Sequence, residues 1–155
     1  MTARDQLTVT EQLQREIEKL GQQAFRNELR SAAGKALTGF PAEVELQAIY
    51  STAERQILYR MRDLLERCQR VDDLKEPVAL ATLAVELGWA TRVTDMYAAY
   101  LRRGPGGRTC AGRCQSEYGQ CTNEYNCDDS GWICICCTPC SLQYMGCVAR
   151  CASPV

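Results

Sequence analysis

Apolar residues recur every three or four positions through most of the first 103 residues, a spacing typical of amphipathic helices. A first helix near 8–33 is indicated by a capping box at Thr8 and Glu11. The apolar stripe of this helix comprises Leu13, Ile17, Leu20 and Ala24. Glycine and proline in the stretch 34–41 predict where it ends.

A second helix is predicted near 42–70, where the same spacing continues through Leu46, Tyr50, Ala53, Ile57, Met61, Leu64 and Cys68. Since Cys68 lies on this stripe, we expect a buried and inert thiol there. Two shorter helices are predicted near 77–87 and 91–103, separated by Gly88 and Trp89. Residues 1–103 are therefore expected to form a helical bundle.

Ten of the eleven cysteines lie at or after residue 110, and eight of these are arranged symmetrically about a central point. Residues that face each other across an antiparallel hairpin have numbers with a constant sum. Four pairs satisfy this condition, namely Cys110 with Cys151, Cys114 with Cys147, Cys121 with Cys140, and Cys127 with Cys134. The spacing predicts four nested disulfides between two antiparallel segments.

The steps within each segment favour helices over strands. Cys110, Cys114 and Cys121 are separated by four and seven residues, which places them on one face of a helix but on both faces of a strand. The sequence Thr138-Pro139 is typical of a helix start. We therefore predict an all-α protein, with the bundle joined by a Gly/Pro linker at 104–109 to a disulfide-stapled helical hairpin at 110–151. In the chain-entropy model the outermost disulfide contributes about 4 kcal/mol.

Cys136 and Cys137 have no partner in this symmetric arrangement. They could form an additional disulfide with each other, with Cys68 or with another chain. Alternatively, a thiolate site for zinc, copper(I) or an iron–sulfur cluster is predicted at a Cys-x-Cys-Cys-x-x-Cys motif formed by Cys134, Cys136, Cys137 and Cys140. The last two residues could also form a redox pair. Under the disulfide interpretation no cofactor is expected.

The chain has no histidine, which removes the usual general base and the usual partner of a serine or cysteine nucleophile. A non-enzymatic protein is therefore expected.

Ala84, Gly88 and Val93 resemble the alanine, turn glycine and buried aliphatic residue of a helix-turn-helix motif, with arginines in or just after its second helix. The formal net charge of −1 argues against binding to duplex DNA.

The cysteines and the start of the chain point to different compartments. Charged residues interrupt positions 1–20, so no secretory signal is expected there, and no transmembrane segment is predicted. Disulfides would place the protein in an oxidising compartment or outside the cell, whereas metal-bound cysteines would suit the cytoplasm. A removed signal, an oxidising cytosol or another export route would reconcile the two observations.

Residues 96–107 resemble the double-glycine junction that ends the leader peptides of some exported bacterial peptides. The resemblance rests on Gly106 and Gly107, and on apolar residues at Met96 and Leu101. It implies cleavage after Gly107, which would release residues 108–155. The alternative is a flexible linker that is not processed.

The motifs Cys110-x3-Cys114 and Cys147-x3-Cys151 resemble the paired Cys-x3-Cys motifs of α-hairpinins and of the small chaperones of the mitochondrial intermembrane space. This resemblance implies two antiparallel helices bridged by nested disulfides, with a binding role for the paired helices. Members of the chaperone family enter an oxidising compartment without a cleaved secretory signal.

These patterns lead to the hypothesis of a recognition or assembly protein that binds a protein partner or a second copy of itself. The expected contact surface lies at the tip of the hairpin and comprises Tyr125, Asp128, Asp129, Trp132 and Ile133. Alternatively, Trp132 and Ile133 fold back to form a small core within the hairpin.

Overall fold

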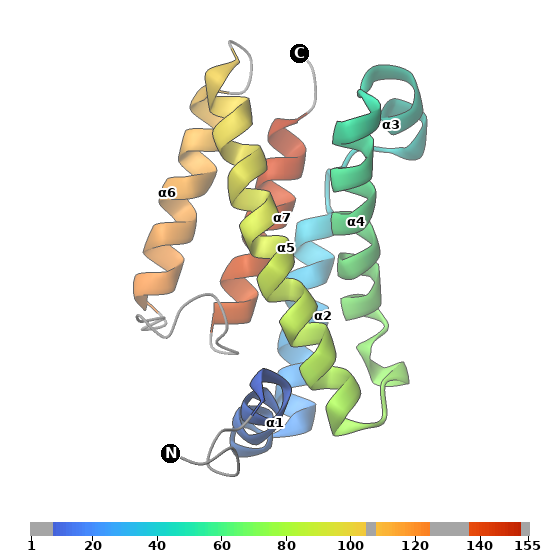
Figure 1. The fold of residues 1–155 in the computed structure, drawn as a ribbon, viewed down its shortest axis with the longest axis vertical. Helices are drawn as coiled ribbons and strands as arrows, with labels where there is room; N and C mark the ends of the chain where they lie inside the picture. The colour runs from blue at the N-terminus through green and yellow to red at the C-terminus, as the bar shows by residue number, and fades with distance from the viewer. Residues whose placement is uncertain (1–7, 105–107, 125–136, 153–155) are drawn as a thin grey trace.

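The computed structural model describes residues 8–104, 108–124 and 137–152 (Figure 1). The described residues are mostly α-helical, with short 3-10 segments, and contain no strand, which confirms the predicted all-α fold class. The helices are α1 (Val9–Leu20), α2 (Gln22–Leu37), α3 (Glu43–Ile49), α4 (Thr52–Gln69), η2 (Val71–Asp73), α5 (Pro77–Arg103), α6 (Arg108–Glu124) and α7 (Thr138–Cys151).

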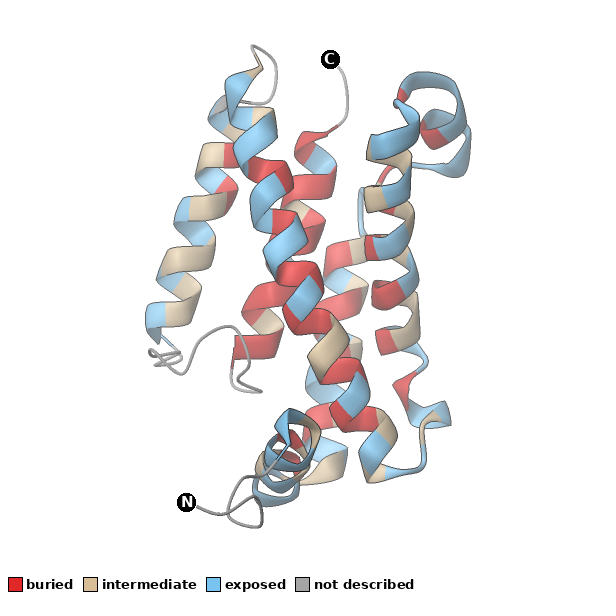
Figure 2. Ribbon diagram, in the orientation of Figure 1, coloured by how far each residue is buried: buried red, intermediate tan, exposed pale blue. Residues whose placement is uncertain are grey.

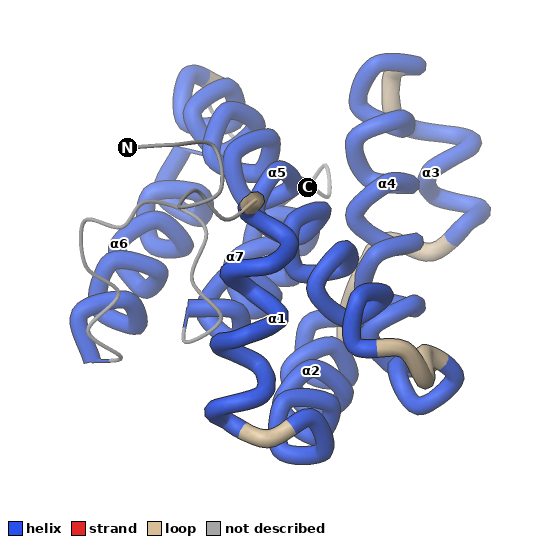
Figure 3. The backbone as a smooth tube through the Cα atoms, turned by 60° about the horizontal axis from the view of Figure 1, so that its bottom comes forward, coloured by secondary structure: helices blue, strands red, loops and turns tan. Residues whose placement is uncertain are grey.

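Helix α7 occupies the middle of the fold, where it packs against α2, α5 and α6 (Figures 1 and 3). Helix α4 packs mainly against α2, whereas α5 lies on α7 and also contacts α1 and α6. Helix α6 runs antiparallel to α7, as predicted for the hairpin (Figure 1). Buried side chains of all seven described α-helices form one continuous core that extends across the boundary expected at 104–109.

The first predicted helix is wrong in its length and continuity. It is divided into α1 and α2 by Gly21, whose φ of 103° lies in a region that glycine tolerates and other residues avoid. The break changes the buried face, so that Leu20 and Ala24 are exposed and Phe25 is buried instead. Helix α2 then continues through Gly34 to Leu37.

The second predicted helix is also divided, because the chain is extended at Tyr50 and Ser51 between α3 and α4. The Ser51 hydroxyl accepts a hydrogen bond from the Glu54 backbone N–H at 3.2 Å and so caps α4. The third and fourth predicted helices are one helix, α5. Its Gly88 is buried in the helix interior, so the turn of the predicted helix-turn-helix motif is absent.

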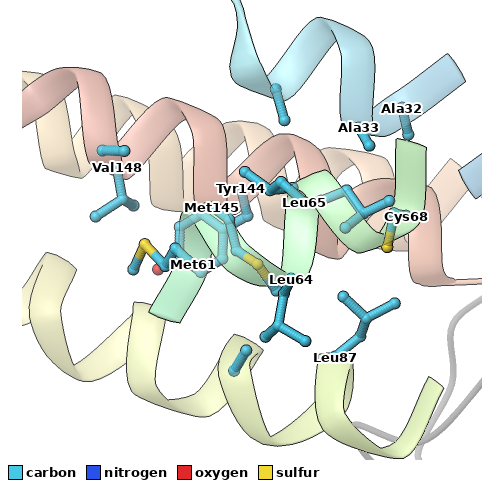
Figure 4. Close-up of a cluster of buried hydrophobic side chains, with 14 of the residues drawn as sticks. Ala32, Ala33, Met61, Leu64, Leu65, Cys68, Leu87, Tyr144, Met145 and Val148 are labelled. Atoms are coloured by element: carbon cyan, nitrogen blue, oxygen red, sulfur yellow. The ribbon is translucent and has the colours of Figure 1, made fainter. Parts of the chain in front are cut away.

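Large side chains from three helices meet in the core. Met61, Leu64 and Leu65 of α4 lie between Leu87 of α5 and Met145 of α7 (Figure 4). Figure 2 shows that α7 is buried on nearly all sides, whereas α5 has an exposed outer face. Helix α7 therefore holds the other helices together. Because it is buried on nearly all sides, it contains few charged residues.

Helices α2 and α7 approach closely because small residues face each other at their crossing. Ala33 and Ala36 of α2 are buried there, and a Cβ placed on Gly146 of α7 would lie 2.6 Å from the carbonyl oxygen of Ala36. Arg150 of α7 donates a hydrogen bond to the carbonyl oxygen of Thr38 at 3.0 Å, which satisfies an acceptor at the C-terminus of α2.

Gly146→Ala is expected to destabilise the oxidised protein by on the order of 3 kcal/mol, because the new methyl group would force the backbones of α2 and α7 apart. The matched control is Gly119→Ala in α6, where a Cβ would have nothing within 4 Å. That control should gain about 0.5–1 kcal/mol from its higher helix propensity. Urea unfolding with the disulfides intact measures both values. Equal effects of the two substitutions would contradict the close crossing.

Candidate functional site

Three disulfides join α6 to α7 and hold them at a constant separation. They link Cys110 to Cys151, Cys114 to Cys147 and Cys121 to Cys140, with Cα–Cα distances of 5.5, 5.7 and 5.7 Å. These are three of the four pairs predicted from the cysteine spacing. The fourth predicted pair, Cys127 and Cys134, lies outside the described residues.

The remaining described cysteines differ in state. Cys137 is also disulfide-bonded, whereas Cys68 is a free thiol in the core, as its position on the apolar stripe predicted. Burial raises the pKa of the Cys68 thiol to about 12, so this residue is un-ionised and unreactive at neutral pH.

Two of the four predicted metal ligands, Cys137 and Cys140, are disulfide-bonded in this structure, while Cys134 and Cys136 lie outside the described residues. A sulfur atom in a disulfide does not provide the thiolate that binds zinc, copper or iron. The disulfide and metal-bound states therefore exclude each other at these two positions, and the metal site stays a prediction.

The two outer disulfides are in contact with each other. The sulfur atoms of Cys110, Cys114 and Cys151 lie within 4.8 Å of one another, and those of Cys114 and Cys151, from different disulfides, are 3.4 Å apart. Both of these cysteines are buried. Since exchange between disulfides requires an attacking thiolate, the packed and oxidised pair is a stable structural staple.

A polar network fastens α6 and α7 to α5. The Tyr144 hydroxyl donates a hydrogen bond to Asp95 at 2.5 Å, and the side chain of Gln115 contacts the same carboxylate at 3.4 Å. Arg102 in turn donates to Gln115 at 2.7 Å. The rings of Tyr118 and Tyr144 stack at a centroid distance of 4.5 Å. Burial, together with the bond to Asp95, raises the pKa of Tyr144 above its usual range.

A surface groove lies between α4 and α5, on the side of the molecule away from α6. Its apolar walls are Ile57, Met61 and Leu64 of α4 and Trp89, Ala90 and Val93 of α5, and its volume is about 420 Å³. A second hollow of about 370 Å³ extends toward Leu74 and Ala79. Arg67 lines both hollows.

Polar contacts bridge the two walls of this groove. Arg67 of α4 forms ion pairs with Asp63 at 3.1 Å and with Glu86 of α5 at 2.8 Å. Further along the two helices, the Tyr97 hydroxyl donates a hydrogen bond to Glu54 of α4 at 2.7 Å. These cross-links set the spacing of the walls, so the groove is a preformed feature of the fold.

One side of α5 is exposed (Figure 2), and beyond the groove this side presents large apolar side chains. Trp89, Val93, Met96 and Tyr100 follow one another at helical spacing, and they are 55, 39, 73 and 57% exposed. Arg92 lies over the Trp89 ring at 5.6 Å from its centroid. A contiguous apolar strip of this kind is typical of a surface that contacts another molecule.

This surface was not among the predicted sites, although its signal is present in the chain. The four residues have spacings of four, three and four, and the opposite side of α5 is equally apolar. The predicted contact residues at the hairpin tip, Tyr125, Asp128, Asp129, Trp132 and Ile133, lie outside the described residues. The same holds for Gly106 and Gly107 of the predicted cleavage junction.

Comparison with protein families finds no matching family model, and comparisons with curated proteins and with solved structures find no match. Among the described helices, none is both long enough and apolar enough to cross a membrane.

Tryptic digestion without reduction provides a direct check of the outermost disulfide. Trypsin cuts after Arg108, Arg113 and Arg150, so Cys110 and Cys151 fall on two short peptides with one cysteine each. Mass spectrometry of oxidised protein should find these two peptides joined to each other. A bond between neighbours, Cys110 with Cys114, would instead join the first peptide to the long fragment 114–150 and would contradict the pairing.

Tyr144→Phe is expected to cost about 1–2 kcal/mol at neutral pH, because it removes a hydrogen bond to a carboxylate. The substitution should also alter the alkaline limb of the stability curve. Above the usual tyrosine pKa of about 10, residue 144 ionises in the unfolded chain before it does so in the folded one, so stability falls as pH rises. The fall measured by urea unfolding between about pH 9 and pH 11 should be shallower in the variant. An unchanged slope would contradict the buried hydroxyl.

Proposed function

We propose that this protein is a non-enzymatic recognition or assembly protein, and that its contact surface is the outer face of α5 together with the α4–α5 groove. The exposed strip of Trp89, Val93, Met96 and Tyr100 is the observation that carries the proposal. Aromatic and methionine side chains are enriched in protein interfaces, where they contribute a large part of the binding energy.

The disulfides support this role indirectly, by keeping the surface rigid. They hold α6 on α7, and α7 lies beneath α5 as part of its support. A preorganised surface loses little conformational entropy when it binds, and binding is correspondingly stronger. The staple is therefore interpreted as a scaffold for the surface on α5 rather than as the contact element itself.

The disulfides are compatible with an oxidising compartment, and we propose that the protein acts there or outside the cell. The absence of histidine, and hence of the usual general base, supports a binding role rather than catalysis.

A photo-crosslinking amino acid placed at position 96 is expected to give a discrete covalent adduct in the cells that make the protein. The same group at position 44 is the matched control, because Val44 of α3 is 76% exposed but lies outside the strip. Gel electrophoresis and mass spectrometry compare the two adducts. Equal labelling from both positions, or none from position 96, would contradict the proposed surface.

A further inference from the structure

We propose that the two outer disulfides, Cys110–Cys151 and Cys114–Cys147, form one thiol-exchange site that oxidises a dithiol. After this exchange the protein retains a single crossed disulfide, Cys114–Cys151, and holds Cys110 and Cys147 as free thiols. The exchange takes place at the joint between α6 and α7 and does not depend on the contact surface of α5. It follows from the distances between the sulfur atoms, from their burial and from the packing that holds them in place.

The two disulfides are close enough to exchange partners. The Sγ atoms of Cys114 and Cys151 belong to different disulfides and are 3.4 Å apart. The Sγ atom of Cys110 lies within 4.8 Å of both. Since a sulfur–sulfur bond is about 2 Å long, the Sγ atoms of Cys114 and Cys151 need to approach by roughly 1.4 Å. Rotation of the two side chains, together with a small shift of α6 along α7, covers that distance.

Burial divides the four cysteines into an inner and an outer pair. Cys114 and Cys151 are 1% and 7% exposed and belong to the hydrophobic core. Cys110 and Cys147 are partly exposed and pack against the edge of that core. A thiolate in solution therefore reaches the sulfur of Cys110 or Cys147 first. Each disulfide thus has one accessible and one buried sulfur, and the two buried sulfurs are the ones in contact.

Attack at either accessible sulfur leads to the same product. A thiolate that attacks Cys110 bonds to that sulfur, breaks the bond to Cys151 and releases the Cys151 thiolate. The Cys151 thiolate then attacks Cys114, which forms the crossed bond and releases Cys147. When the incoming thiolate attacks Cys147 instead, the Cys114 thiolate is released, attacks Cys151 and displaces Cys110. In both cases the second thiol of the dithiol resolves the mixed disulfide.

Electrons and protons balance over the whole exchange. The dithiol loses two electrons and two protons and becomes a disulfide. Cys110 and Cys147 take up these electrons and protons and become two thiols. The reductant that the exchange requires is a dithiol, either a small molecule or a pair of cysteines exposed on another protein.

Burial favours the crossed disulfide over either original one. A thiolate released at Cys114 or Cys151 lies in the core, where it is poorly solvated, and attack on the neighbouring sulfur removes its charge. A thiolate released at Cys110 or Cys147 lies at the edge, where water solvates it. Loop closure does not distinguish the three bonds, because their sequence separations of 41, 33 and 37 residues are similar.

Packing keeps α6 on α7 while the bonds exchange. The third disulfide, Cys121–Cys140, joins the two helices seven residues further along each of them. The rings of Tyr118 and Tyr144 stack between the helices, and Asp95 of α5 accepts hydrogen bonds from both. These contacts hold the sulfur atoms close together when one bond is open. The hairpin is therefore expected to stay folded and cross-linked after a first reduction.

Partial reduction of the full-length oxidised protein tests the proposal. The protein is titrated with dithiothreitol, quenched with acid, alkylated with N-ethylmaleimide and digested without further reduction. Trypsin then gives the peptides 109–113 with Cys110, 114–150 with Cys114 and Cys147, and 151–155 with Cys151. Chymotrypsin cuts the long peptide after Tyr118 and Tyr144 and so separates Cys114 from Cys147. Mass spectrometry identifies which peptides are joined and which are alkylated.

Each possible product has its own set of peptides. We expect 151–155 joined to 114–118, with Cys110 and Cys147 alkylated, as the main form that has taken up two electrons. Loss of the Cys110–Cys151 bond alone would give 109–113 and 151–155 as separate alkylated peptides. Loss of the Cys114–Cys147 bond alone would leave those two peptides joined. Either simple product as the main form would overturn the proposal, and so would reduction of these bonds only after circular dichroism shows unfolding.

Cysteine variants test the rearrangement without a reductant. Cys110→Ser leaves Cys151 free beside the Cys114–Cys147 bond, and we expect conversion to Cys114–Cys151 with Cys147 alkylated. Cys147→Ser should give the same disulfide, with Cys110 alkylated. Cys114→Ser is the matched control, because it removes one of the two sulfurs in contact and should retain Cys110–Cys151.

The same peptide analysis identifies the bonds, and circular dichroism shows whether each variant is folded. A folded Cys110→Ser protein that keeps Cys114–Cys147 as its main bond would overturn the proposal. If a variant does not fold, the reduction of the unsubstituted protein decides between the crossed and the simple products.

Discussion

The burial of α7 is the constraint on which the other helices depend. This helix contacts α2 through the close approach of Gly146 to Ala36, lies beneath α5, and is joined to α6 by disulfides. Helix α7 is therefore joined to its neighbours both by packing and by covalent bonds. The outer face of α5 is rigid because its inner face rests on α7, and the α4–α5 groove is preformed because α4 meets α7 and α5 in the same core (Figure 4).

The cysteine spacing predicted the hairpin well because it encodes two properties at once. Steps of four and seven determine which face of each helix the sulfurs occupy, and the symmetry of the positions determines which sulfurs meet. This is why the bonds Cys110–Cys151, Cys114–Cys147 and Cys121–Cys140 were predicted correctly. The packing of α7 into the bundle was not predicted, because it depends on small residues such as Gly146, whose contacts are set by a distant segment.

Helix boundaries were predicted less well for a related reason. A glycine inside a helix destabilises that helix by about 1 kcal/mol relative to alanine. Tertiary packing compensates for this loss at some positions and not at others. Gly21 interrupts a helix, whereas Gly34 and Gly88 lie within helices, and the local sequence does not distinguish them. The exposed strip on α5 was missed because apolar residues surround that helix, so its periodicity alone does not reveal which side faces outward.

The central position of α7 also has a consequence for biosynthesis. This helix is encoded after the six others, so the ribosome releases α1 to α5 before the segment that completes their core exists. The early helices can pack on one another, α2 on α4 and α1 on α5, but the faces that α2 and α5 turn toward α7 have no partner until translation has passed α7. Formation of the disulfides adds a further delay, because it requires an oxidant and takes seconds to hours. The core around α7 is therefore completed only after translation has passed that helix, and the disulfides between α6 and α7 cannot form before then.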